Sequence, residues 1–202
     1  SAVGSPFPAS AQVVQSPIVA NLDDDNGDGL INDLDFPEII FTTYCGSDFT
    51  SNGILRAIHG GGPTKGQDFF ASCDTTVWHE GDDPNAVTCA CSSAILDSTA
   101  SLAVGDLDYD GVPEIVAIHE TSNRVVIYSN TGELIHTTTI NGEGNNPGPA
   151  IANLDNDGFA EIIVGRQVYT LDHDANNALI IVDRFQGNLN QGSPGARCAR
   201  PC

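Results

Sequence analysis

Three segments of this 202-residue chain share one pattern. Each begins with a short apolar run, continues into an Asp-rich loop that contains Gly, and ends with Glu before a second apolar run. The segments read PIVANLDDDNGDGLINDLDFPEII at 17–40, LAVGDLDYDGVPEIV at 102–116 and PAIANLDNDGFAEIIV at 149–164. Internal repeats constrain the fold strongly, because each copy must form the same supersecondary unit and bury its apolar face against a neighbouring copy.

The loops of the second and third segments carry oxygen ligands at alternate positions. Ca²⁺ is bound by about six to eight oxygens from carboxylates, carbonyls and water, and alternate side chains of a tight loop converge on one point. Gly at the sixth position allows a positive φ, a backbone carbonyl follows it, and a later acid closes the cage. The predicted ligands are Asp106, Asp108, Asp110, the Val112 carbonyl and Glu114, and then Asn153, Asp155, Asp157, the Phe159 carbonyl and Glu161.

The loop of the first segment is longer. Asp23 and Glu38 are 15 positions apart, against 6 for Asp108 and Glu114, so nine residues are inserted. The short pattern survives as Asn21, Asp23, Asp25 and Glu38. The insertion adds an EF-hand-like pattern whose closing acid is Asp rather than the usual Glu; its ligands are Asp24, Asn26, Asp28, the Leu30 carbonyl and Asp35. We expect one or two ions here, hence three to four Ca²⁺ in the chain, with lanthanides accepted in the same oxygen cages.

A single Asp/Asn/Gly loop is often an ordinary solvated turn. Three such loops in the same position relative to flanking apolar runs are poorly explained in that way. A fourth, weaker candidate loop holds Asp172, Asp174 and Asn176, and for that one a simple turn is the preferred interpretation.

The repeated segments resemble the FG-GAP/VCBS repeats of integrin α-type β-propellers and of many secreted bacterial proteins. The matching motif is the DxDxDGxxE-like loop at 106–114 and 153–161, interrupted at 21–38, and the resemblance covers about 17–44 and 101–185. It implies four-stranded blades with one Ca²⁺ in each loop. It leaves the function open, because such blades serve adhesion, carbohydrate binding, polysaccharide cleavage and scaffolding.

The predicted fold is all-β: three four-stranded propeller-like blades, a partial or open β-propeller, with a disulfide-rich insertion. Short Val/Ile runs separated by Gly and Pro, without a sustained helical period, support this class. The runs PEIIF, PEIVAI and AEIIVG are continuous, which is typical of strands covered on both faces. Expected strands lie near 17–22, 37–44 and 53–60, then 101–105, 113–119, 124–129 and 133–140, then 149–153, 160–165, 167–171 and 178–184.

The remaining segments flank or interrupt these blades. We expect an extended, unpacked N-terminal arm at 1–16, blades at about 17–60, 101–140 and 149–185 within 17–185, a Cys-rich insertion at 61–100, and a Cys-stapled tail at 186–202. Six cysteines without a CxxC zinc pattern indicate disulfides and an oxidising compartment. Cys198–Cys202 with two bridges in the insertion is one pairing, and a bridge from tail to insertion is the alternative. Zinc binding is weakly supported, since His59 and His79 lack a matching spacing.

The net charge of −20 excludes nucleic acids and anionic membranes as partners. The three loops hold 14 of the 27 acids, so the charge is concentrated where a cation would neutralise it. The chain has no transmembrane run, and its first residues, SAVGSPFPAS, look like a mature terminus left after signal-peptide cleavage. These features predict a secreted, extracellular or cell-surface protein without membrane insertion.

No catalytic motif is found, and the chain is predicted not to be an enzyme. A calcium-dependent polysaccharide lyase is a minor alternative, because the chain has a single Lys, Lys65, and few Arg to serve as a base. The five histidines are expected mostly at the surface or on edge strands, and Trp78 is a candidate contact residue.

Three blades are too few for a closed propeller, which needs about four to eight. The first functional hypothesis is therefore a secreted calcium-binding structural protein that self-assembles into a ring, tube or filament, as a homo-oligomer or polymer. The alternative is a calcium-dependent cell-adhesion or glycan-binding module, with a glycan or an extracellular protein as its partner.

Overall fold

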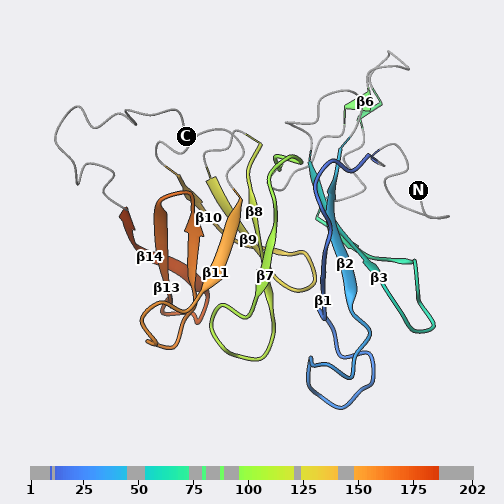
Figure 1. Ribbon diagram of the computed structural model, residues 1–202, viewed down its shortest axis with the longest axis horizontal. Coiled ribbons are helices and arrows are strands. Elements are labelled where there is room, and N and C mark those ends of the chain that lie inside the picture. Colours follow the sequence, from blue (N-terminus) through green and yellow to red (C-terminus); the bar gives the residue numbers. More distant parts are fainter. Residues whose placement is uncertain are drawn as a thin grey trace, which may run out of the picture.

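The computed structural model describes residue 10 and residues 12–44, 53–72, 79–80, 87–88, 96–120, 124–140 and 148–186. In this part the chain is all-β, as predicted. Three four-stranded sheets stand side by side, and a two-stranded sheet of β5 (His79–Glu80) and β6 (Val87–Thr88) lies apart from them (Figure 1). None of the described segments forms a helix with the length and hydropathy of a membrane span. All six cysteines, Trp78 and the tail after residue 186 lie outside the described residues.

Each four-stranded sheet is an antiparallel meander in which neighbours in sequence are neighbours in space. The orders are β1-β2-β3-β4, β10-β9-β8-β7 and β11-β12-β13-β14. The strands are β1 Ile18–Ala20, β2 Glu38–Thr43, β3 Ile54–His59, β4 Asp68–Ala71, β7 Ala103–Gly105, β8 Glu114–Ile118, β9 Arg124–Tyr128, β10 Leu134–Thr139, β11 Pro149–Ala152, β12 Glu161–Val164, β13 Gln167–His173 and β14 Leu179–Gln186. The predicted strands therefore match the observed ones closely.

The fourth strand of the first sheet was hidden from sequence reasoning. β4 comes after residue 60, where the first blade was expected to end, and it pairs with β3. It has only four residues, each half-buried at the edge of the sheet. So short a run after a Gly-rich stretch carries no alternating pattern, which is why the sequence did not reveal it.

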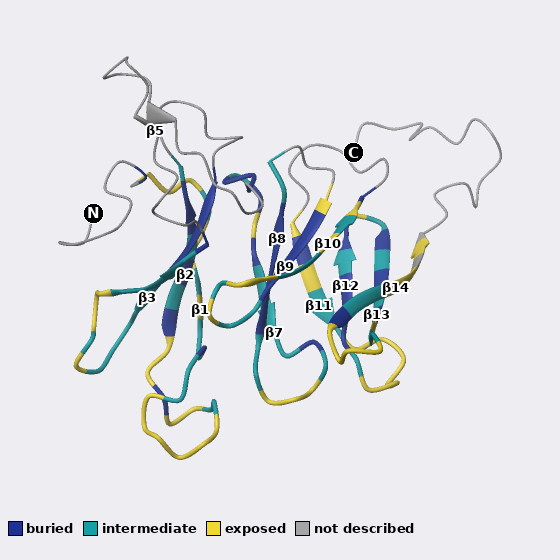
Figure 2. Cartoon of the chain, turned by 180° about the vertical axis from the view of Figure 1, so that it is seen from behind, coloured by how far each residue is buried: buried dark blue, intermediate teal, exposed yellow. Residues whose placement is uncertain are grey.

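The central strands of the middle sheet, β8 and β9, are buried on both faces. In β8 every residue is buried (Figure 2), and successive side chains pack in different apolar clusters. Ile115 and Ala117 pack in the cluster shared with the first sheet, whereas Val116 and Ile118 pack in the cluster shared with the third. The continuous apolar run PEIVAI therefore reflects two separate cores, one on each side, as predicted.

The two outer sheets depart from that expectation. In β2, Ile40 is fully buried but Ile39 and Phe41 on the other face are only half-buried. Val19 on β1 is 62% exposed and Phe185 on β14 is 54% exposed. Within the described residues each outer sheet has one neighbouring sheet, so only one of its faces is covered. Burial on both faces therefore does not explain the continuous apolar runs of these two sheets.

One residue of the N-terminal arm, Ser10, packs on the first sheet, whereas Gln12, Val13, Val14 and Ser16 are exposed. The Ser10 side chain is buried and its Oγ donates to Thr43 Oγ1 at 2.9 Å. Arg56 Nη1 donates to the Ser10 carbonyl at 3.2 Å, and Gln12 pairs with Tyr44 as an isolated bridge. The arm is extended here because its backbone and hydroxyl groups find partners on the first sheet.

Leu96 joins the first and second sheets. It forms antiparallel bridges with Gly53 on one side and His119 on the other, and its side chain is fully buried. Gly53 is required at this contact, because a Cβ there would lie 2.3 Å from the Leu96 carbonyl oxygen.

We expect Leu96→Ala to lower the free energy of unfolding by about 2–5 kcal/mol, since it removes a buried side chain and leaves a cavity that the tightly packed junction cannot fill. Val182→Ala, at a site 53% exposed, should change it by less than about 0.5 kcal/mol. Urea unfolding of both variants provides the measurement. Equal small losses would show that Leu96 does not couple the sheets.

Candidate metal sites

The closing Glu of each segment is built into the fold in the same way three times. Glu38, Glu114 and Glu161 open the second strand of their sheets and are 0%, 6% and 1% exposed. One carboxylate oxygen accepts the backbone N–H of the Leu that follows the first loop ligand; the donors are Leu22 at 2.9 Å, Leu107 at 2.9 Å and Leu154 at 2.6 Å. Each Glu thereby ties the start of its loop to the start of the next strand.

The loop at 106–114 closes on itself through its acids. Asp106 accepts the N–H groups of Asp110 at 3.1 Å and Gly111 at 2.9 Å, and Gly111 has the positive φ of 90° that the turn needs. One potential ligand atom from each of Asp106, Asp108 and Glu114 lies within 4.8 Å of the other two. Asp110 does not join this group, and its carboxylate accepts the Val112 N–H at 2.7 Å.

The loop at 153–161 repeats this arrangement. Asp155, Asp157 and Glu161 bring ligand atoms within 4.8 Å of one another. Asn153 lies at the first position and its Oδ1 accepts the Asn156 N–H at 2.6 Å, while Asp157 accepts the Phe159 N–H at 3.0 Å. The second oxygen of Glu161, Oε1, is buried and has no hydrogen-bond partner among the described residues. An orphaned buried carboxylate oxygen is costly, and a cation in the loop would satisfy it.

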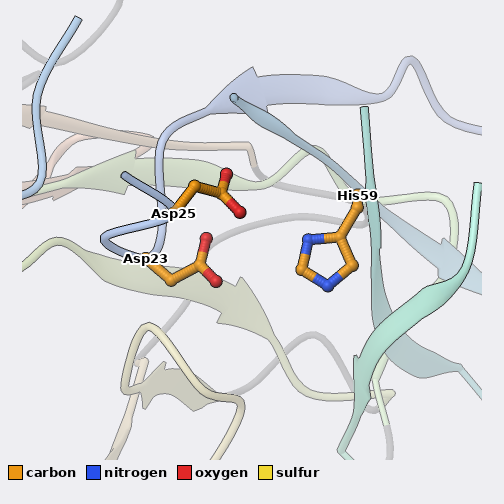
Figure 3. Close-up of side chains that lie close together, drawn as sticks. All are labelled: Asp23, Asp25 and His59. Atoms are coloured by element: carbon orange, nitrogen blue, oxygen red, sulfur yellow. The ribbon is translucent and has the colours of Figure 1, made fainter. Parts of the chain in front are cut away.

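In the first loop the structure brings together Asp23, Asp25 and His59 (Figure 3). Their potential ligand atoms also lie within 4.8 Å of one another. Glu38 adjoins this group, because His59 Nδ1 lies 3.2 Å from Glu38 Oε1. Asn21 Oδ1 and Asp23 Oδ1 are buried, and within the described part of the chain neither has a hydrogen-bond partner. Three residues of the short pattern, Asp23, Asp25 and Glu38, therefore lie at one place, together with a histidine that was not predicted.

The EF-hand-like segment of the first loop has the local structure of the second loop. Asp24 accepts the N–H groups of Asp28 at 3.0 Å and Gly29 at 2.8 Å, as Asp106 does with the equivalent residues. Asp35 instead accepts the N–H groups of two other loop residues, Asn26 at 3.3 Å and Asn32 at 2.8 Å. Asp24, Asp28 and Asp35 are not among the acid groups whose ligand atoms converge in the described residues. A second ion bound by this segment and the Leu30 carbonyl stays a prediction.

Burial makes three of the site carboxylates, those of Glu114, Glu38 and Asp23, harder to ionise when no cation is present. It raises the pKa of Glu114 to about 7, and the negative charges of Asp108, Asp110 and Asp106 add to the effect. Burial is also the main cause of the raised pKa values of Glu38 and Asp23. A cation would reverse this balance by holding the carboxylates ionised.

Sequence reasoning missed two histidines that contact the loops. His59 lies on the inner strand β3 and its side chain is only 13% exposed, so the expected surface or edge position is wrong for it. His173 on β13 lies 2.8 Å from Asp108 through Nε2 and against the Phe159 ring, at 5.3 Å between centroids. The signal for His59 was its place at the end of the strand that pairs with the Glu38 strand, directly opposite Glu38.

The weak fourth candidate forms a turn in the structure. Asp174 Oδ1 accepts the N–H groups of Asn176 at 2.7 Å and Ala178 at 2.9 Å, which lowers the pKa of Asp174. Asp172 Oδ1 accepts the N–H of His173, and no described contact joins the Asp172 carboxylate to this turn. The preferred interpretation of this segment as a turn is therefore confirmed.

The raised pKa of Glu114 predicts a pH dependence with a definite sign. In the absence of divalent cations the folded protein prefers protonated Glu114, so the melting temperature should fall as the pH rises from about 4.5 to about 7. Glu114→Gln should flatten part of this slope. Excess Ca²⁺ should oppose it, because a metal requires ionised ligands and binds more tightly as the pH rises. Thermal denaturation with and without EGTA tests this; an identical slope in Glu114→Gln would contradict it.

Comparison with known proteins agrees with this architecture. Residues 106–164 match the family described as FG-GAP-like repeat. Nineteen chains of known structure match the fold, and one is the crystal structure of the V. cholerae biofilm matrix protein Bap1, with 29% sequence identity and a TM-score of 0.60. That match covers 80% of this chain and 24% of the Bap1 chain, so the chain spans about a quarter of its length. No curated protein matches by sequence.

The family match starts at Asp106, the first acid of the second loop, and ends at Val164, after the third loop and its strand. It therefore spans the two short loops predicted as cation sites and the whole middle sheet from β8 onward. The first segment, with its nine-residue insertion, lies outside it. Residues 106–164 are thus similar to the FG-GAP-like repeat family, and the three four-stranded sheets of the described chain are consistent with open, propeller-like blades.

Proposed function

We propose that this chain is an extracellular, calcium-stabilised structural protein that self-assembles through its two outer sheets. The observation that carries the proposal is the apolar row on each outer face. On the first sheet Val19, Ile39 and Ile58 lie side by side across three strands. On the third sheet the corresponding row is Ala150, Ile163, Val168 and Phe185. Val19 and Phe185, at the ends of the rows, are more than half exposed.

The packing between neighbouring sheets within the molecule shows the form that such a contact would take. The first and second sheets pack through one apolar cluster, and the second and third pack through another. An outer first sheet of one copy laid on the outer third sheet of another would repeat this packing. The contact joins two different surfaces, so it gives a ring where the rotation closes and a filament where it does not.

Calcium is the ion we assign to the second and third loops. Their converging ligands are all carboxylate oxygens, the type that hard cations such as Ca²⁺ select, and lanthanides would take the same places. The second loop contacts the third sheet through Asp108 and His173, and the backbone N–H of Ala160 donates to the Leu107 carbonyl at 2.8 Å. An ion in either loop therefore stabilises the packing of neighbouring blades as well as the loop itself.

The likeness to a biofilm matrix protein supports an extracellular place for this chain and favours a second candidate function. In that alternative the chain is a calcium-dependent adhesion module that binds a matrix glycan or protein. Neither function includes an enzymatic activity, and a lyase would additionally need a base beside a carbohydrate groove. Particle size separates the two candidates, because an adhesion module stays monomeric and binds a glycan on an array.

Asp108→Ala and Asp155→Ala should each weaken Ca²⁺ binding by at least about tenfold, because each removes a carboxylate from the converging group of its loop. Both should also lower the melting temperature in Ca²⁺ more than in EGTA. Glu133→Ala, which removes an exposed acid outside the loops, should leave both quantities unchanged. Isothermal titration calorimetry with Ca²⁺ is the measurement. Ca²⁺ affinities equal to that of the unmodified protein in both loop variants would remove the calcium assignment.

Electron microscopy in millimolar Ca²⁺ should show rings, tubes or fibres that disappear in excess EGTA. Val19→Asp and Phe185→Asp should each prevent assembly, because a buried unpaired charge opposes sheet packing. Leu134→Asp is the matched control: Leu134 is 43% exposed but lies on β10, the edge strand of the middle sheet. Monodisperse small particles of the unmodified chain in both conditions would reject self-assembly and favour the adhesion module.

A further inference from the structure

We infer that the first loop binds a transition-metal ion such as Zn²⁺ through Asp23, Asp25 and the imidazole of His59. This site differs in ligand chemistry from the two all-oxygen loops. The inference does not depend on calcium binding in those loops or on self-assembly.

His59 is held rigidly beside the two carboxylates. The β2–β3 register places it directly opposite Glu38, whose side chain is fully buried. Its ring packs against Phe69, with 5.0 Å between centroids, and a ring nitrogen faces the carboxylates of Asp23 and Asp25 (Figure 3). A donor fixed by a strand and by packing is preorganised, which is what a metal ligand requires.

Two buried oxygens at this place have no partner in the described structure. They are Asp23 Oδ1 and Asn21 Oδ1. The amide nitrogen of Asn21 is engaged by the Asn32 carbonyl, which fixes the side chain with its oxygen unpaired. Buried acceptors left in this way destabilise a fold unless a cation or water satisfies them. A metal ion beside Asp23 would be the missing partner of its carboxylate oxygen. A turn without an ion leaves that oxygen unpaired.

Among the described residues, an imidazole lies opposite the closing Glu only in the first sheet; His173 contacts Asp108 of the second loop but belongs to none of the groups of converging ligand atoms. Continuing the β8–β9 register by one residue places Ser129 opposite Glu114, and the β12–β13 register places Thr170 opposite Glu161. These two sheets thus have a hydroxyl where the first has His59. Ca²⁺ prefers oxygen ligands, whereas imidazole together with carboxylates suits Zn²⁺ and other late first-row ions. The mixed nitrogen and oxygen set therefore assigns a different ion to the first loop.

Calorimetric titration of the full chain with ZnCl₂ in excess Ca²⁺ tests this assignment, because Ca²⁺ occupies the oxygen sites first. One equivalent of Zn²⁺ should bind to the unmodified protein, and His59→Ser should weaken this binding by at least about tenfold. Serine is the chosen replacement because the second sheet has it at the corresponding position. The matched control is His136→Ser, since His136 on β10 belongs to none of the described groups of metal-ligating side chains; its Zn²⁺ binding should be unchanged.

Two results would overturn the inference: Zn²⁺ binding by His59→Ser with unchanged affinity, or an equal loss of binding in His136→Ser. Imidazole ¹⁵N shifts of the unmodified chain provide a readout that does not depend on the variant folding. Zn²⁺ should move the His59 signals in the presence of excess Ca²⁺, and His59 signals that stay in place would equally reject the site. A calcium-binding defect of the other two loops would leave both readouts intact.

Discussion

The buried closing glutamate is the constraint on which each blade depends. It lies at the first position of a central strand, is almost inaccessible to water, and accepts the N–H of the Leu at the second position of the loop. That one bond fixes the direction of the loop and directs the other acids toward the same point. The arrangement concentrates negative charge in a poorly solvated place, and the raised pKa of Glu114 is the direct result. Such a blade is stable when a cation balances the charge that its geometry creates.

Stacking of blades follows from the same units. Each blade has two apolar faces, and only the middle one has both covered by sheets of the described chain. Contacts between loops strengthen the stack at one end of the molecule: Asn130 in the β9–β10 turn donates to the Leu22 carbonyl at 2.8 Å, and His173 contacts Asp108. The loops are therefore parts of the interfaces between blades. An ion bound in such a loop would stabilise the loop and the neighbouring blade together.

Much of this structure follows from the sequence because the repeat encodes local geometry. The Asp-rich loops, the closing glutamates and most strands depend on residues within about fifteen positions of one another, where turn chemistry and apolar runs are decisive. The exceptions depend on contacts between distant segments. β4 is an edge strand defined by its pairing with β3, Ser10 is buried by groups on the first sheet, and Leu96 bridges two sheets across long gaps in sequence. No local pattern predicts such contacts.

The place of His59 in the first loop does not follow from the residue alone, but it does follow from the register of its strand. Seen alone it was one of five scattered histidines, but its strand pairs with the strand that begins at Glu38, and that pairing places its ring in the first loop. The same register connects the loop to the outer face of the sheet. Ile39 follows Glu38 and Ile58 precedes His59, and these two residues pair across the strands within the outer apolar row. An ion held by the first loop would therefore fix the strand ends that present this row, because ligands and apolar residues alternate along the same two strands. Metal binding in the first loop and the shape of the outer face would then depend on the same two strands, β2 and β3.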